Sequence, residues 1–240
     1  MKYEFTKTLA TTLSTPDTKV TAIRVPFSKF VVDMGLSVKW AACNLGAATV
    51  TGYGDYYAWG ETAPYYENGY ASETPGTHWK TGKTSGYIWA SYQWNPSCDG
   101  STFTKYTGSD YDTIRAADDA ATAAYGSPYR MPTSAEVDDL LNASNCDKEW
   151  VADYLSTGVS GYLFTGKKSG YESQKIFLPA AGYRYSTSLS YAGSAGGYWS
   201  SSLNTSKLYE AWLLGFSNYE GVSKASYNRF YGLSVRPVSE

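Results

Sequence analysis

Hydrophobic and polar positions alternate in short runs along most of the chain, which is the pattern of β-strands with one buried face. Residues 20–25 read VTAIRV, and residues 31–41 predict a strand and a turn. From residue 158 to the end, short apolar runs separated by Gly and Ser again predict strands. Residues 62–110 show little periodicity, so we expect loops that cross a surface there.

Helical spacing occurs in two segments. The first is the Ala-rich stretch from Ile114 to Tyr125. The second begins at Thr133, three residues before Glu136, and this spacing predicts a capping box in which each side chain bonds to the backbone N–H of the other residue. Apolar residues then recur at helical spacing. Strands, two helices and then many strands predict an α+β fold.

The N-terminal 30 residues differ from the rest of the chain. They are rich in Thr and contain one or two short alternating runs, with Pro16 and Asp17 as a turn signal. A segment this short has no core of its own. We therefore expect a short β arm at 1–30, used for attachment or for assembly of a homo-oligomer such as a trimer, and a single domain over 31–240.

Aromatic residues stand out in the composition. Of 240 residues, 24 are Tyr, 8 are Trp and 23 are Gly, whereas only 18% are charged. Tyr and Trp offer large contact areas at little cost in rotamer entropy, and small polar residues supply adaptable hydrogen bonds. A β-rich core can absorb part of these rings, but so many tyrosine hydroxyls need partners. The composition therefore favours a binding surface.

The charge pattern argues against several classes of partner. The net charge is −2, and Lys and Arg are not clustered as a nucleic-acid-binding face would require. No apolar run approaches the roughly 18 residues of a membrane span. The first six residues lack the apolar stretch of a signal peptide. We expect no nucleic-acid partner and no membrane insertion.

Residues suited to catalysis or metal binding are sparse. The cysteines are Cys43, Cys98 and Cys146, an odd number without a CxxC pair. We expect three buried free thiols, and one disulfide bridge with one free thiol is the alternative. His78 is the single histidine and is interpreted as a surface loop residue. The segment around Asp99 lacks the carboxylate spacing of a calcium loop. We therefore predict no catalytic residue, no metal site and no cofactor.

Six phrases, in order along the chain, resemble the signatures of one family. They are VDMGLSVKWA at 32–41, YGDYYAWGE at 53–61, YRMPT at 129–133, IFLPAAGYR at 176–184, YWSSS at 198–202 and GLSVRPV at 232–238. Together they resemble the Fibrobacter succinogenes major paralogous domain family of bacterial surface and adhesin-like proteins. The resemblance implies a C-type-lectin-like fold with two helices, short twisted antiparallel strands and long loops.

The same fold is related to the formylglycine-generating enzymes, whose chemistry needs a reactive cysteine pair late in the domain. No cysteine follows Cys146, so the resemblance does not extend to that activity. The EPN and QPD motifs of calcium-dependent animal lectins are also absent, and Trp199 is followed by Ser200 where those lectins have Asn. Sugar binding through calcium is therefore not implied.

Between Tyr183 and Tyr231 a regular framework alternates with Tyr, Ser, Asn and Gly. This resembles the variable region of proteins diversified by retroelements, in which adenine-directed mutagenesis changes exposed side chains while the strands persist. An ordinary Tyr-rich domain with one fixed ligand is the alternative. Alternate strand residues face outward and could form the binding surface. The predicted ligand-binding residues are Tyr185, Ser188, Tyr191, Tyr209, Trp212, Ser217, Asn218, Tyr219, Tyr227, Asn228 and Tyr231.

The leading hypothesis is a non-catalytic recognition module, an adhesin on a bacterial surface or a receptor-binding protein at the tip of a phage tail. It would bind a protein or glycan receptor on a target cell through exposed, clustered aromatics. The main alternative is a structural or pilus-associated surface subunit, which would bury these aromatics in an assembly interface. An enzyme resembling the formylglycine-generating enzymes is the third hypothesis and would require a deep pocket with perturbed titratable groups.

Overall fold

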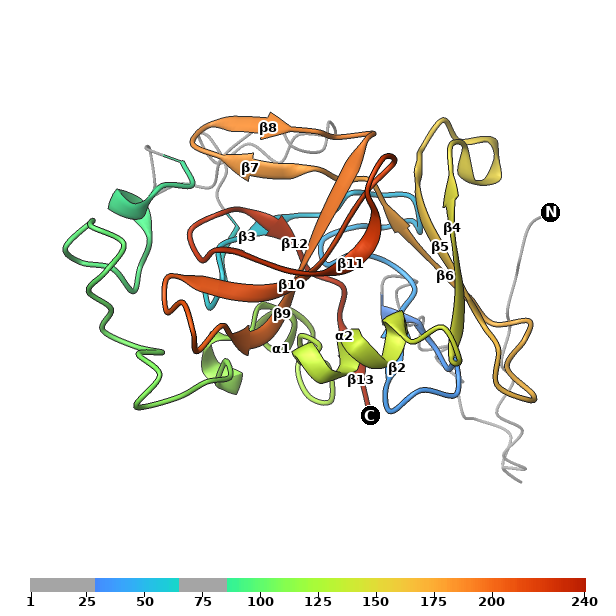
Figure 1. Ribbon diagram of the computed structural model, residues 1–240, viewed down its shortest axis with the longest axis horizontal. Helices are drawn as coiled ribbons and strands as arrows, with labels where there is room; N and C mark the ends of the chain where they lie inside the picture. The colour runs from blue at the N-terminus through green and yellow to red at the C-terminus, as the bar shows by residue number, and fades with distance from the viewer. Residues whose placement is uncertain (1–28, 65–85) are drawn as a thin grey trace, which may run out of the picture.

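The computed structural model describes residues 29–64 and 86–240 (Figure 1). The arm predicted for residues 1–30 lies outside these ranges except for its last two residues, and His78 also lies outside them. Strands predominate in the described part and are joined by two α-helices, which confirms the α+β prediction. None of the helices described is both long enough and apolar enough to cross a membrane.

The largest sheet of the described chain has the strand order β11–β10–β9–β12–β3. Its long antiparallel strands lie next to one another, whereas β12 runs parallel to β9 and antiparallel to β3. The sheet occupies the middle of the molecule (Figure 1). Its strands are β3 (Tyr56–Tyr57), β9 (Ala195–Leu203), β10 (Glu210–Ser217), β11 (Gly221–Asn228) and β12 (Leu233–Ser234).

Three smaller sheets surround this central sheet. The order β1–β2–β13 brings the first and last described strands together, while β4–β5–β6 and the hairpin β7–β8 lie on other sides (Figure 1). The strands are β1 (Val31–Val32), β2 (Lys39–Ala41), β4 (Cys146–Val151), β5 (Gly161–Gly166), β6 (Lys175–Pro179), β7 (Tyr183–Tyr185), β8 (Ser188–Ser190) and β13 (Val238–Ser239). The helices are α1 (Ala120–Tyr125) and α2 (Ser134–Leu141).

The two faces of the central sheet have different surroundings because side chains alternate along each strand. Even-numbered residues of β9 and β10, such as Tyr198, Leu214 and Phe216, belong to a buried cluster with Val137 and Leu140 of α2. Helix α2 packs across β9, β10 and β11 on this face. We refer to it below as the helix face of the sheet.

The odd-numbered face is covered over only part of its length. Trp199, Ala211 and Leu213 lie in a second buried cluster, together with Trp59 and Tyr106 from the N-terminal half of the chain. Further along the same strands the odd positions carry small residues, and this cluster does not extend over them. The uncovered part of this face is the place where a binding surface can form.

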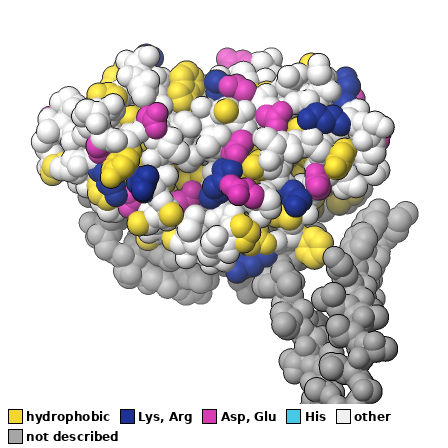
Figure 2. All heavy atoms as spheres, turned by 90° about the horizontal axis from the view of Figure 1, so that it is seen from below, with side chains coloured by type: hydrophobic (Ala, Val, Ile, Leu, Met, Phe, Trp, Pro, Cys, Tyr) yellow, Lys and Arg dark blue, Asp and Glu magenta, His cyan; other side chains and the backbone are white. Residues whose placement is uncertain are grey.

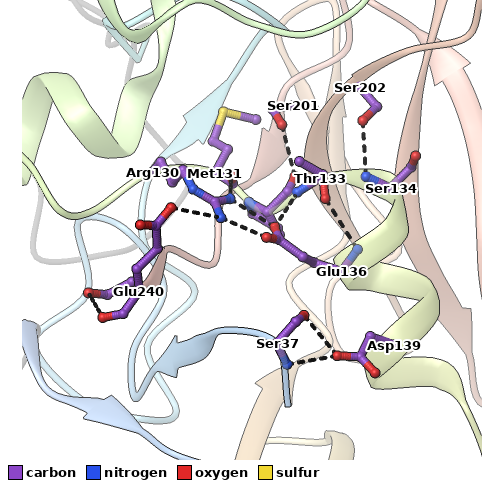
Figure 3. Close-up of polar contacts among 12 residues, drawn as sticks. Ser37, Arg130, Met131, Thr133, Ser134, Glu136, Asp139, Ser201, Ser202 and Glu240 are labelled. Carbon is purple, nitrogen blue, oxygen red and sulfur yellow. Dashed lines mark hydrogen bonds and ion pairs between the residues drawn. The ribbon is translucent and has the colours of Figure 1, made fainter.

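The second predicted helix and its capping box are confirmed. The Glu136 backbone N–H donates to Thr133 Oγ1 at 3.2 Å, and the Thr133 N–H donates to Glu136 Oε2 at 2.7 Å (Figure 3). The Arg130 guanidinium donates hydrogen bonds to both oxygens of the same Glu136 carboxylate, at 2.8 and 2.6 Å. The start of α2 is therefore fixed by three residues that lie close in sequence.

The first predicted helix is too long. Only Ala120–Tyr125 is α-helical, a short 3-10 turn precedes it, and the Ile114 N–H donates to the Ser201 carbonyl at 2.8 Å in extended conformation. The reason lies at Asp119, whose carboxylate accepts hydrogen bonds from the backbone N–H groups of Ala121 and Thr122 at 2.9 Å each and so caps a helix that begins at Ala120.

The cysteine prediction is correct for two of the three thiols. Cys43 and Cys146 are buried and free, and burial raises the pKa of Cys43 and raises that of Cys146 to about 11. Cys98, however, is exposed. It lies in a tight turn with a φ of 57°, between Ser97 and Asp99, which are exposed as well.

Candidate functional site

Five tyrosines from separate segments meet beside the central sheet, and we call them the tyrosine cluster. The Tyr183 ring centroid lies 5.6 Å from that of Tyr191, 6.1 Å from that of Tyr227 and 5.5 Å from that of Tyr231. Tyr185 lies 5.5 Å from Tyr231. Ring pairs at such spacings attract one another beyond the area they bury. The cluster is therefore a packed layer rather than a set of independent side chains.

Backbone pairing holds this layer together. Arg184, between two of the tyrosines on β7, exchanges hydrogen bonds of 2.8 and 3.0 Å with Gly232, which directly follows Tyr231. Phe230 is buried below and stacks on Tyr231 with ring centroids 4.7 Å apart. The cluster is thus supported from beneath by the core.

Burial and mutual contact change the titration of the inner rings. Partial burial raises the pKa of Tyr183, and the neighbouring phenols of Tyr191, Tyr231 and Tyr227 raise it further. The pKa of Tyr231 is raised for the same reasons, first by burial and then by its tyrosine neighbours. Both phenols therefore stay neutral at physiological pH and can donate hydrogen bonds from the edge of the cluster.

A groove of about 430 Å³ lies next to the cluster on the odd-numbered face. Tyr183, Tyr191 and Tyr227 contribute to its lining, together with the turn that joins β10 to β11. From Leu213 to Ser217 the groove follows β10 for roughly 13 Å, given about 3.3 Å per residue in a strand. It is therefore long enough to receive an extended side chain or a short chain segment.

Small residues create the hollow. The floor comes from odd positions of three adjacent strands, and their side chains are too short to fill the space above the sheet. Gly215 faces Gly197 on one neighbouring strand and Ser223 on the other. The floor residues are Ala195, Gly197, Gly215, Ser217, Gly221, Ser223 and Ala225.

The turn at Ser217–Gly221 closes one end of the groove. Ser217 Oγ accepts hydrogen bonds from the backbone N–H groups of Tyr219 at 3.3 Å and Glu220 at 2.9 Å. Gly221 has a φ of 79°, a left-handed conformation that favours glycine over other residues. This geometry leaves the Tyr219 side chain 90% exposed at the end of the groove.

The structure brings most of the predicted binding residues together. Four of them, Tyr185, Tyr191, Tyr227 and Tyr231, belong to the tyrosine cluster. Ser188 pairs with Tyr185 across the β7–β8 hairpin, and Ser217, Asn218 and Tyr219 form the turn end of the groove. Their role in binding remains a prediction.

Three predicted residues lie elsewhere, which corrects the expectation of one common surface. Trp212 and Asn228 occupy even positions of β10 and β11, on the helix face, where Lys224 Nζ lies 5.2 Å from the Trp212 ring centroid. Tyr209 is exposed but precedes β10, at the end of that strand remote from the groove's turn. For Trp212 and Asn228 the physical reason is the two-residue period of a strand, which sends neighbouring side chains to opposite faces.

Sequence reasoning missed Tyr183 and the floor of the groove. Tyr183 contacts three other rings of the cluster, yet it stood only at the boundary of the predicted region. Gly197, Gly215 and Ala225 were not among the predicted binding residues, because their small side chains carry no functional group. The available signal was their shared two-residue spacing with Ser217 and Tyr227.

The loop around Asp99 is stabilised by hydrogen bonds among its own residues. Asp99 accepts from the backbone N–H groups of Ser101 at 2.8 Å and Thr102 at 3.0 Å, and Asn95 donates to it at 3.1 Å. In residues 29–64 and 86–240, no group of three or more His, Cys, Asp or Glu side chains is placed to hold a metal ion.

Comparison with known proteins gives a match to part of the chain. A family model described as a domain of unknown function (DUF8237) matches residues 163–238, about a third of the chain. The matched segment contains β6 to β12 and therefore both the tyrosine cluster and the groove. No curated protein and no solved structure matches the chain.

Proposed function

We propose that this chain is a non-catalytic recognition module whose tyrosine cluster and groove bind a protein or glycan receptor. One observation carries the proposal: rings from three separate segments meet beside a hollow floor of small residues. Large rigid rings supply contact area, and their hydroxyls supply hydrogen bonds at the edge. A concave surface lined in this way is suited to a ligand rather than to the packing of the chain itself.

Exposure of the rings supports a binder. Tyr191 is 62% exposed and Tyr219 is 90% exposed, far more than large aromatic side chains in a packed core. The competing hypothesis, a structural subunit, requires the same rings to be buried against neighbouring copies in an assembly. If the chain is a binder, loss of these rings should abolish receptor binding. If it is a structural subunit, their loss should abolish self-association.

A recognition module of this kind would have a C-type-lectin-like fold and would act outside the cell. Two helices, antiparallel strands and long loops in the described chain support a C-type-lectin-like domain, in which the strands hold a display surface. A protein of this kind would act at a bacterial cell surface or at the tip of a phage tail. The arm at 1–30 would then attach the domain to its assembly.

The test is a binding experiment with a triple variant, Tyr191→Ser with Tyr219→Ser and Tyr227→Ser. The full chain is screened on arrays of glycans and bacterial surface proteins, and the ligands found are titrated by biolayer interferometry. We expect the triple variant to bind at least about 100-fold more weakly, because three exposed aromatic anchors are removed. Circular dichroism checks that the β-sheet signal is retained.

Tyr111→Ser provides a matched control, because Tyr111 is also exposed but lies in a loop outside the groove. It should bind as the wild type does. Equal affinity of the triple variant and the wild type for every ligand would contradict the proposal. Loss of self-association without loss of ligand binding, measured by sedimentation, would identify a structural subunit instead.

Diversification of this surface is tested by sequencing sibling genes across codons 183–231. If the region is diversified, differences should fall in adenine-containing codons for exposed residues such as Asn218, Tyr219 and Tyr227. Codons for Leu214 and Phe216, which are buried on the helix face, should stay unchanged. An invariant region, with no reverse transcriptase gene or template copy nearby, would exclude this mechanism and leave a fixed-ligand module.

A further inference from the structure

The charge around the groove is one-sided. Of the described residues that line it, Glu220 alone has a charged side chain. Glu220 is exposed, and the ion pairs of the described chain do not include it. The faces of the surrounding tyrosine rings carry the negative part of the aromatic quadrupole. The groove therefore presents a surface that attracts cations.

Positively charged side chains near the groove are directed elsewhere. Lys224 extends from β11 on the helix face, where it forms an ion pair with Asp138 of α2 and lies over the Trp212 ring. Arg184 is only 2% exposed and lies beneath the cluster, 5.4 Å from the ring centroid of Tyr56. Neither residue lines the groove.

The side of the molecule that carries α2 and β13 has a different charge pattern. Seen from below, from the side of α2 and β13, the surface carries Lys and Arg side chains interspersed with Asp and Glu (Figure 2). Ion pairs that involve residues of α2 include Arg130 with Glu136 and Lys224 with Asp138. The unpaired acidic charge at an aromatic groove is thus a local feature, not a consequence of the nearly balanced net charge of −2.

We propose that the groove binds the cationic side chain of a protein ligand, with arginine favoured over lysine. The aliphatic part of such a side chain would lie over the floor of Gly215 and Ala225, and its head group would reach the tyrosine rings and Glu220. A guanidinium is planar and stacks on aromatic rings, which an ammonium group cannot do. This inference rests on the proposed recognition function and specifies its ligand class.

A sugar fits the polar groups of the groove less well. Ser217 Oγ is engaged by the backbone N–H groups of the turn, and Ser194 Oγ donates to the Tyr191 carbonyl at 3.1 Å. Two of the serine hydroxyls that line the groove, those of Ser194 and Ser217, are therefore already engaged with the backbone. The Glu220 carboxylate, the charged group in the lining, favours a cationic ligand.

The test is a titration of the full chain, labelled with ¹³C in its tyrosine rings, followed by NMR. The probes are the blocked tripeptide Gly-Arg-Gly, the same peptide with the neutral isostere citrulline, and methyl glucoside. Single Tyr→Phe variants assign the resonances of Tyr191, Tyr219 and Tyr227. We expect the arginine peptide to shift these resonances with at least about tenfold higher affinity than either other probe.

Charge-neutral variants make the test specific. Glu220→Gln should lower the affinity for the arginine peptide about fivefold and leave the affinity for the citrulline peptide unchanged. Glu149→Gln, at an exposed position of β4, is the matched control and should change the affinity for neither peptide. Equal affinity for arginine and citrulline peptides, tighter binding of methyl glucoside, or no effect of Glu220→Gln would each overturn the proposal.

The two proposals can fail separately. If the triple tyrosine variant loses its receptor but the arginine probe shows no preference, the recognition function stands and the cationic ligand class is overturned. If the triple variant keeps its receptor, the site itself is misplaced, whatever the peptides show.

Discussion

Glu136 illustrates how one residue can control the acid stability of a helix. Burial raises its pKa, but the hydrogen bonds from Arg130 and from the Thr133 backbone outweigh this and hold the pKa below its usual range (Figure 3). A lowered folded-state pKa stabilises the fold above the unfolded pKa of about 4.3, and that stability is lost as the pH falls through the folded value. The free-energy difference between wild type and Glu136→Gln should therefore be largest near neutral pH and shrink in acid.

Urea denaturation between about pH 7 and pH 3 measures this difference. Glu149→Gln, at an exposed strand position, is the control and should remain close to the wild type throughout. A Glu136→Gln deficit that does not change with pH would mean that the carboxylate charge does not contribute.

Residue spacing also explains which features of the structure the sequence predicts. The Thr133–Glu136 capping box is local, so three-residue spacing suffices to place it. The exclusion of Trp212 and Asn228 from the groove depends instead on which face of the sheet is covered, and the helix that covers it is distant in sequence. A register shift between Ala211 and Leu213 adds an irregularity that alternation alone does not reveal.

At the scale of elements, Arg236 joins three segments of the fold. Its guanidinium is fully buried and donates to Asn44 Oδ1 at 2.9 Å, to the carbonyls of Ala41 and Ala42 at 3.0 and 2.8 Å, and to the Phe177 carbonyl at 2.7 Å. These bonds tie the chain before β13 to the end of β2 and to β6. We expect Arg236→Lys to destabilise the domain by about 4 kcal/mol, since one ammonium cannot satisfy acceptors in four directions.

The free energy of unfolding of the wild type and of Arg236→Lys, measured in urea, tests this prediction. Arg115→Lys is a matched control, because Arg115 is exposed and only lies over the Tyr111 ring, so its replacement should change stability by less than about 0.5 kcal/mol. Losses of similar size in the two variants would show that Arg236 does not hold the elements together.

For the whole molecule, the sequence correctly predicts the α+β class, although β4 was missed because three of its six residues are charged. Assembly remains a prediction. Lys29 anchors the start of the described domain, since its Nζ donates to the Tyr125 carbonyl at 3.2 Å and its carbonyl accepts from the Tyr129 hydroxyl at 2.6 Å. Residues 29–240 should therefore keep the domain intact without the preceding arm.

Deletion of residues 1–28 tests the role of the arm. We expect a trimer for the full chain and a monomer for residues 29–240 by sedimentation, with melting temperatures of the domain within about 2 °C. Identical oligomeric states for the two chains would place assembly contacts in the domain itself.

The division of the central sheet into a packed face and an open face has a practical consequence for protein engineering. Positions such as Ser217, Ser223 and Tyr227 stand on the open face, whereas the side chains of Leu214 and Phe216 belong to the buried cluster that includes Val137 and Leu140 of α2. A combinatorial library could randomise the first set while the backbone ladder and the second set stay fixed. Binders selected from it would inherit one common fold, so their affinities could be compared without separate structural work on each.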